Sequence, residues 1–237
     1  MQVTEVTESF NLNNVVPFFQ PIMDLKNNSV WSYECLARLL TLDQNRFLPT
    51  EFLFLVERQQ SVALLTQTLL SRSAIYFRDI NMAWNINLSL ADMTDSGTLN
   101  FLQSQLTDYP NPKRISIEIT AQNALLESAK FSQFSEICDA LGINIVIDNF
   151  DLQECDLQAI LRLPISAIKV SATLFDKVTS EVATADFVKG LISTAANNKI
   201  KVIAERIERP ETLEVVKQLG IKYAQGFYFS QPKAKAV

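Results

Sequence analysis

Charged and amide side chains follow short apolar runs at several places along the chain, and runs of this kind are typical of β-strands. These strand-end residues are Glu34, Asn87, Glu118, Asp148, Asn149, Lys169, Glu205 and Gln225. Carboxylates gathered from different strands repel one another and shift each other's pKa unless a cation neutralises them. Oxygen ligands of this type suit Mg²⁺, Mn²⁺ or Ca²⁺. The pattern alone is equally compatible with a metal site and with a structural network of ion pairs.

The elements that must position these side chains alternate between strand-like and helix-like segments. Strands are predicted over 16–24, 29–40, 83–89, 114–120, 144–150, 167–172, 201–207 and 223–229. Apolar residues at helical spacing fill most of the intervals. One helix is predicted to begin at Pro49, one to run from Ala124 to a stop at Gly142, and one to run from Pro210 to Gly220, because proline favours a first turn and glycine a last one.

Eight strands with helices between them predict an α/β fold, a modified TIM-type (β/α)8 barrel. The polar turn at 26–28 leaves too little chain for a parallel crossover, so one antiparallel strand pair is expected near the N-terminus. An open doubly wound sheet is the alternative, but no glycine-rich phosphate loop follows a strand. In a barrel the strand-end residues would meet at one mouth, where barrels carry their chemistry.

Composition narrows the chemistry further. The chain has 237 residues, 21 Lys and Arg against 26 Asp and Glu, a formal net charge of −5, and no histidine. The charge argues against direct binding of a nucleic acid polymer. The missing histidine excludes Ser-His-Asp and Cys-His catalysis and His-ligated zinc. Three cysteines (Cys35, Cys138, Cys155) without CxxC spacing indicate a reducing compartment, and no signal peptide or apolar span stands out, so we expect a cytoplasmic protein that contacts no membrane.

The strand-end residues lie in strings that resemble a known family. The strings are FFQPI, YECLAR, NINLS, SIEIT, VIDNF, AIKVS, AERIE and YAQGFYFSQP. Their order and spacing over nearly the whole chain resemble the EAL domain, the cyclic di-GMP phosphodiesterase family of bacterial signalling proteins. We expect a polar tail over 1–14 and a single EAL-like barrel domain over 15–237.

The resemblance implies roles for individual residues and a two-metal, Mg²⁺- or Mn²⁺-dependent opening of cyclic di-GMP to pGpG. The implied ligands of the first metal are Glu34, Asn87, Glu118 and Asp148. The implied catalytic residues are Lys169, Glu205 and Glu208. The implied nucleotide contacts are Gln20, Arg38 and Gln225.

Departures from the family pattern fall at the implied second metal site. The family's second aspartate is Asn149, its KID aspartate is Ser171, its loop-anchoring glutamate is Ala121, and the glycine of its AEGVE motif is Arg206. Losing three carboxylates and gaining one cation makes the region about four charge units less negative than in an active relative. The family's glycine-containing loop is replaced at 151–156 by a sequence without glycine. Because neighbours alternate along a strand, Arg206 is expected to point away from Glu205.

These departures favour a degenerate EAL domain that binds cyclic di-GMP, a protein partner or both, with little or no hydrolysis and at most one Mg²⁺ or Mn²⁺ site. Slow hydrolysis is the first alternative, since the first-metal set is complete. A nucleotide-independent interaction scaffold is the second, with the tail and the 151–156 loop as contact regions. A homodimer is possible. The thiols of Cys35 and Cys155 are expected to be unreactive.

Overall fold

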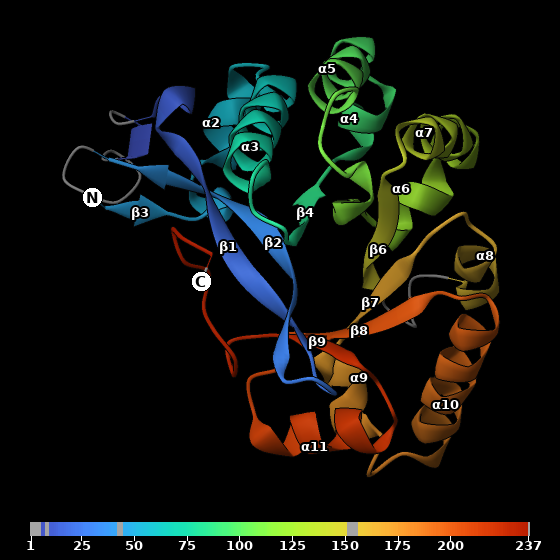
Figure 1. The fold of residues 1–237 in the computed structure, drawn as a ribbon. Coiled ribbons are helices and arrows are strands. Elements are labelled where there is room, and N and C mark those ends of the chain that lie inside the picture. Colours follow the sequence, from blue (N-terminus) through green and yellow to red (C-terminus); the bar gives the residue numbers. More distant parts are fainter. Residues whose placement is uncertain (1–5, 8–9, 42–44, 151–155, 237) are drawn as a thin grey trace.

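The computed structural model describes residues 6–7, 10–41, 45–150 and 156–236, which form one sheet surrounded by helices (Figure 1). Its strands are β1 (Val15–Asp24), β2 (Ser29–Leu40), β3 (Arg46–Phe47), β4 (Ala83–Asn87), β5 (Ile115–Thr120), β6 (Asn144–Phe150), β7 (Ala167–Ser171), β8 (Lys201–Glu205) and β9 (Tyr223–Gln225). Its helices are η1 (Leu12–Asn14), α2 (Pro49–Arg58), α3 (Val62–Phe77), α4 (Leu90–Thr94), α5 (Ser96–Leu106), η2 (Pro112–Arg114), α6 (Ala121–Leu126), α7 (Ser128–Leu141), α8 (Leu157–Leu161), α9 (Ala172–Lys177), α10 (Val182–Asn197) and α11 (Pro210–Gln218). Every predicted strand is present.

The strands close into a ring in the order β1-β9-β8-β7-β6-β5-β4-β2, with β2 pairing back to β1. Strand β1 runs antiparallel to both its neighbours, β2 and β9. All other neighbouring strands in the ring pair in parallel: β2 with β4, β4 with β5, and so on in chain order to β8 with β9. The short β3 pairs with β2 outside the ring. The predicted modified (β/α)8 barrel with an antiparallel pair near the N-terminus is therefore confirmed.

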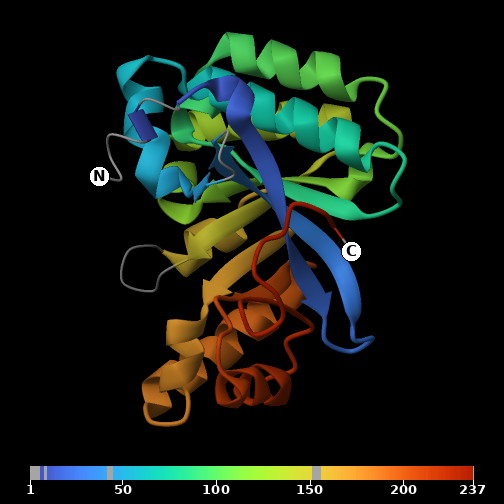
Figure 2. The same cartoon turned by 90° about the vertical axis from the view of Figure 1, so that its left-hand side faces the viewer.

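The predicted turn between β1 and β2 forms a hairpin. The Asp24 carboxylate accepts hydrogen bonds from the backbone N–H of Lys26 at 2.9 Å and of Asn27 at 3.1 Å, and Asn28 takes the left-handed φ of 48° that asparagine tolerates. Beyond the ring, the C-terminal segment runs beside β1 (Figure 2), where Phe19 and Lys233 exchange backbone hydrogen bonds of 2.7 and 3.0 Å.

Helix ends follow the sequence signals, with one exception. Prolines begin α2 and α11, and Gly142 follows α7 with a left-handed φ of 70°. The single helix expected from Ala124 to Gly142 is instead two, α6 and α7. The backbone leaves the helical region at Glu127, with φ −124° and ψ 53°.

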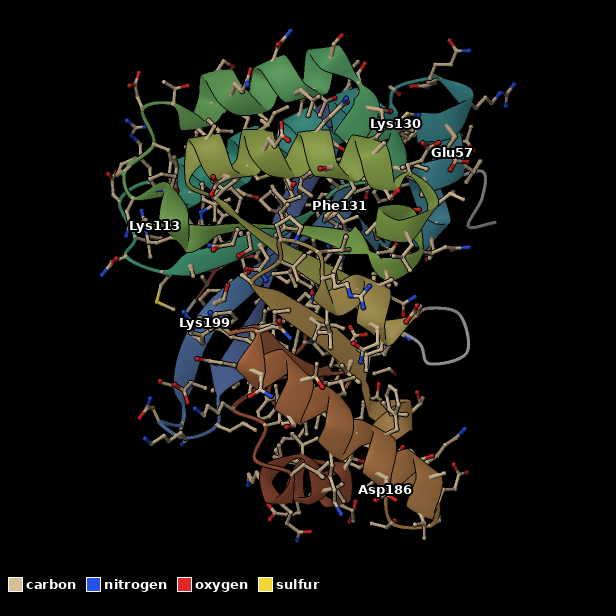
Figure 3. All side chains as sticks on the ribbon, turned by 90° about the vertical axis from the view of Figure 1, so that its right-hand side faces the viewer. Glu57, Lys113, Lys130, Phe131, Asp186 and Lys199 are labelled. Carbon is tan, nitrogen blue, oxygen red and sulfur yellow. The ribbon has the colours of Figure 1, made fainter. Side chains whose placement is uncertain are left out.

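The core has one apolar region between strands and helices and another inside the ring. Phe131 on the sheet side of α7 belongs to the outer region, whereas Lys130 beside it points outward (Figure 3). Inside the ring, Ile22, Val146, Ala167 and Ile203 form an apolar layer. Because side chains two apart in a strand share a face, the next inward-facing residues on the mouth side of this layer are Gln20, Asp148, Lys169 and Glu205.

At the opposite end of the barrel, Arg114 links several segments; it is the last residue of η2 and directly precedes β5. Its guanidinium donates to main-chain carbonyls of Phe77, Arg78, Ile80, Met82 and Pro110. The guanidinium carbon also lies 5.8 Å from the centre of the Tyr109 ring. One side chain thus fixes the α3–β4 connection against the residues that lead into β5.

Candidate active site

Lys169 lies at the centre of the mouth, two residues above the inner apolar layer on β7. Its Nζ lies 2.8 Å from Glu34 Oε2, 2.7 Å from Glu118 Oε2 and 3.7 Å from Asp148 Oδ1. The lysine side chain is only 1% exposed. These groups come from β7, β2, β5 and β6, so ring closure brings together side chains far apart in the sequence, as predicted.

Amide side chains hold the Glu34 carboxylate in place. Asn87 Nδ2 donates to Glu34 Oε1 at 2.8 Å, and Gln225 Nε2 donates to Glu34 Oε2 at 2.7 Å. Gln225 Nε2 also donates to Gln20 Oε1 at 3.1 Å, and Gln20 in turn donates to the Ser230 carbonyl at 3.1 Å. Each of the two carboxylate oxygens of Glu34 therefore accepts at least one hydrogen bond from the protein.

Two further polar residues, which the sequence reasoning missed, lie inside the ring beneath this set. Asn85 Nδ2 donates to Glu118 Oε1 at 2.7 Å, and Ser32 Oγ donates to Asn85 Oδ1 at 2.8 Å. Both are completely buried. Their signal was the alternation itself, because Asn85 lies two residues before Asn87 and Ser32 two before Glu34.

The Lys169 ammonium contacts both Glu34 and Glu118, but the pKa values of these two carboxylates shift in opposite directions. Burial alone would raise the pKa of Glu34, but the charge of Lys169 and the hydrogen bonds from Lys169, Asn87 and Gln225 lower it to about 2. Burial raises the pKa of Glu118 well above its ordinary value, and the neighbouring Glu34 charge adds to this. Burial opposes the charge of Lys169, yet the carboxylates around it raise its pKa well above normal. Glu34 is thus the carboxylate that stays ionised beside the ammonium.

Glu205 ends β8 at the edge of this cluster. Burial, followed by the charge of Asp148, raises its pKa to about 7 despite the opposing charges of Lys169 and Arg206. One oxygen of each carboxylate, Glu205 Oε1 and Asp148 Oδ1, is buried with no hydrogen-bond partner among the described residues. A carboxyl with a pKa near neutrality can take up and release a proton at physiological pH.

A cavity of about 350 Å³ opens over these groups. It is lined by Gln20, Glu34, Leu36, Asp148, Glu205, Arg206, Glu208, Gln225, Gly226 and Phe227. Most of the predicted site residues thus share one cavity or its floor. Arg38 is not among the lining residues. It lies four residues beyond Glu34 on β2, donates to the Ala37 carbonyl at 2.7 Å, and its guanidinium carbon is 5.9 Å from the Phe18 ring centre.

Three of the positions that depart from the family pattern offer no carboxylate to the mouth. Ala121 is completely buried at the start of α6. Ser171 Oγ caps α9, accepting from the backbone N–H of Thr173 at 3.4 Å. Asn149 has a left-handed φ of 51°, and its Oδ1 accepts a hydrogen bond of 3.5 Å from Arg206 Nη2. Residues 151–155 of the variant loop, with Cys155, lie outside the described residues.

The expectation that Arg206 points away from the mouth is wrong. Arg206 lines the same cavity as Glu205 and also the neighbouring cavity of about 250 Å³, which Ser171 and Glu208 line as well. Strand β8 ends at Glu205, and Arg206 has a left-handed φ of 58°. Strand alternation no longer applies beyond that point, which is why the rule failed.

Oxygen donors of the kind that divalent cations take line the mouth. Four carboxylates (Glu34, Glu118, Asp148, Glu205) lie around one ammonium. Asp148 Oδ1 and Glu205 Oε1 accept no hydrogen bond from the described residues and are hard ligands of the type that divalent cations take. No group of three acidic or thiol side chains among the described residues is spaced to hold a metal ion.

The described cysteines are buried and inert. Burial raises the pKa of Cys138 to about 12 and raises that of Cys35 as well. Neither thiol therefore supplies a thiolate near neutral pH.

Comparison with known proteins assigns the class of this fold and site. Residues 3–232 match the EAL domain family, and the chain belongs to it. It is 22% identical over 235 residues to the bifunctional diguanylate cyclase/cyclic di-GMP phosphodiesterase MucR of Pseudomonas aeruginosa, covering 96% of this chain and 34% of MucR. It is 24% identical over 234 residues to the probable cyclic di-GMP phosphodiesterase PdeG of Escherichia coli, covering 94% of this chain and 46% of PdeG. The chain thus spans less than half of either relative.

A solved structure supports the fold. The phosphodiesterase PaMucR in complex with cyclic di-GMP superposes with a TM-score of 0.85 at 21% identity, over 98% of each chain.

Among the described residues, no helix combines the length and apolar character needed to cross a membrane.

Proposed function

We propose that this EAL domain binds cyclic di-GMP and turns it over slowly or not at all. The observation that carries the proposal is the contact between Arg206 and Asn149 at the mouth. Where the family has a carboxylate and a glycine, this chain has a neutral amide facing a guanidinium. A fixed cation at this point opposes the entry of a second metal ion.

Binding is supported by the remaining lining of the cavity. Gln20 and Gln225 offer amide groups, Glu208 a carboxylate and Phe227 an aromatic ring that is 55% exposed, a mixture suited to a nucleotide. Arg38 lies on the same face of β2 as Glu34 and could reach a phosphate that enters from that side. The similarity to a structure solved with cyclic di-GMP favours this ligand.

Slow turnover is supported by what the mouth lacks. Glu205, with its pKa raised to about 7, is suited to proton transfer, so a missing proton acceptor is not the defect. A divalent cation bound at Asp148 and Glu205 would polarise a phosphate oxygen. A second cation, needed to stabilise both the attacking and the leaving oxygen, finds no carboxylate at Asn149 or Ser171.

Paired measurements on one preparation test the proposal. Isothermal titration with cyclic di-GMP is expected to give saturable binding, and chromatography after incubation with Mn²⁺ is expected to give no pGpG above the no-protein control. Rapid formation of pGpG would identify an active phosphodiesterase and overturn the proposal that turnover is slow or absent. Absence of binding with and without Mg²⁺ would remove the receptor function and leave an interaction scaffold.

Restoring the missing acids sharpens the test. Asn149→Asp with Ser171→Asp, followed by Ala121→Glu, is expected to raise Mn²⁺-dependent release of pGpG. Ala121 is changed last because it is completely buried and a carboxylate there risks the fold. The same variant carrying Glu34→Gln is the matched control and is expected to be inactive. No gain in the restored variant would place the defect in the 151–156 loop.

A further inference from the structure

The geometry of Arg206 points to a residue that replaces a divalent cation: we infer that its guanidinium binds a ligand phosphate, so that cyclic di-GMP binds without metal. The inference rests on the proposed function and adds to it the cation that neutralises the phosphate. Arg206 would act as a ligand-binding residue and not as a catalytic one.

The backbone at Arg206 is held in a conformation that arginine disfavours. Its φ of 58° lies in the left-handed region, which costs a residue with a Cβ about 1 kcal/mol or more. The neighbouring Ile207 is completely buried, and its N–H donates to the Gln225 carbonyl at 3.0 Å while its carbonyl accepts from Tyr228 N–H at 2.9 Å. These contacts fix the turn whatever side chain precedes it. A strained arginine at a site wall, where glycine would be relaxed, is a feature associated with function.

Arg206 forms no ion pair with any of the described residues. Its hydrogen-bond partner among the described residues is the neutral Asn149 at 3.5 Å, and no carboxylate of these residues lies within 4.0 Å of its guanidinium. Neighbouring Arg209 differs, since its Nη2 lies 2.7 Å from Asp176 Oδ1. Arg206 is exposed and therefore available to an anion from solution.

The position of Arg206 suits a phosphate in the cavity. It forms part of the wall of both the 350 Å³ cavity and the 250 Å³ cavity beside it. Guanidinium groups bind phosphate through paired N–H donors and stay charged at every physiological pH. The cavity is also lined by the acids Asp148 and Glu205, which would repel an unaccompanied phosphate. Arg206 would supply the opposing charge that a metal ion otherwise supplies.

The test is titration of cyclic di-GMP into wild type, Arg206→Gly and Arg206→Lys, each in excess EDTA and in Mg²⁺. Wild type is expected to bind equally well in both. Arg206→Gly is expected to lose about tenfold or more in EDTA, because a charge-assisted bond is lost, and to recover in Mg²⁺. Arg206→Lys is expected to fall between them. Glycine relaxes the left-handed turn, so this variant should fold, which thermal unfolding verifies.

Arg58→Ala is the control, since it removes an exposed arginine at the end of α2 that lines neither cavity, and it is expected to bind like wild type in EDTA. Two results would overturn the inference while leaving the proposed function intact: wild-type binding that requires Mg²⁺, or Arg206→Gly binding as well as wild type in EDTA. Failure of wild type to bind in either buffer would overturn both.

Discussion

The barrel contains a long cationic side chain at each end, and the two are held in opposite ways. At the mouth, Lys169 is held by the carboxylates of Glu34, Glu118 and Asp148. At the base, Arg114 is held by main-chain carbonyls of the α3–β4 connection and of Pro110. Main-chain carbonyls carry no net charge and do not titrate. Carboxylates carry a charge when ionised, and they titrate.

This difference separates the end that stabilises from the end that can respond. The Arg114 contacts depend on shape and on the number of N–H donors, so they should be insensitive to pH and to ligands. The Lys169 cluster has more acids than bases, and two of its carboxylate oxygens accept no hydrogen bond from the described residues, so it should respond to protons, cations and phosphates. In (β/α)8 barrels the mouth carries function and the base stability.

The largest effect should come from breaking the mouth cluster. Lys169→Met leaves Glu34 and Glu118 buried without a cation, and we expect a loss of about 3–5 kcal/mol of unfolding free energy at pH 8. The loss should shrink at pH 5, where protonation relieves the buried carboxylates. Urea denaturation at both pH values measures this, with exposed Lys189→Met as control. A loss below about 1 kcal/mol at pH 8 would mean that the cluster does not behave as a buried ion network.

A smaller effect is expected at Glu205, which makes the mouth sensitive to pH. Its pKa is raised from 4.5 to about 7, so between these pH values the folded protein keeps a proton that the unfolded chain has released. Stability should therefore fall as pH rises from 4.5 through 7, by on the order of 3 kcal/mol.

Glu205→Gln should remove this fall and stabilise the protein at pH 8. Denaturation curves across this pH range provide the measurement, and the exposed Glu211→Gln serves as the comparison. A slope that is unchanged in Glu205→Gln would assign the pH dependence to another group.

The smallest effect, and the one free of pH dependence, is expected at the base. Arg114→Met leaves several carbonyls without their donor and should cost about 2 kcal/mol, equally at pH 5 and pH 8. Arg114→Lys should recover little, because one ammonium cannot reproduce the spread of the guanidinium. Affinity for cyclic di-GMP should not change in either variant. A Kd shift as large as that of Arg206→Gly would show that the two ends are coupled, and Arg58→Met controls for loss of surface charge.

Much of the barrel could be predicted because its signals are local. Each strand is a short apolar run, and the tight turn at Asn28 requires a hairpin. The strand-end residues Glu34 and Lys169 were predictable as neighbours because ring closure brings them together. The inward-facing Asn85 and Ser32 could also have been predicted, because side chains alternate between the two faces of a strand and these residues lie two positions before Asn87 and Glu34.

Other features depend on tertiary structure and left no local signal. The direction of the Arg206 side chain depends on a backbone turn. Hydrogen bonds between Ile207 and two residues much later in the chain, Gln225 and Tyr228, fix that turn. The role of Arg114 depends on carbonyls presented by a distant loop. The break between α6 and α7 at Glu127 was missed because apolar spacing continues across it.

The two antiparallel partners of β1 also set an order of events during synthesis. The hairpin with β2 can form as soon as residues 15–40 have emerged from the ribosome, whereas the other edge of β1 pairs with Tyr223–Gln225. That edge therefore waits for most of the chain to be translated, and contacts so distant in sequence form slowly. During the interval the unpaired edge is open to other strands. The seam between β1 and β9 is where we expect nascent chains to be captured by chaperones.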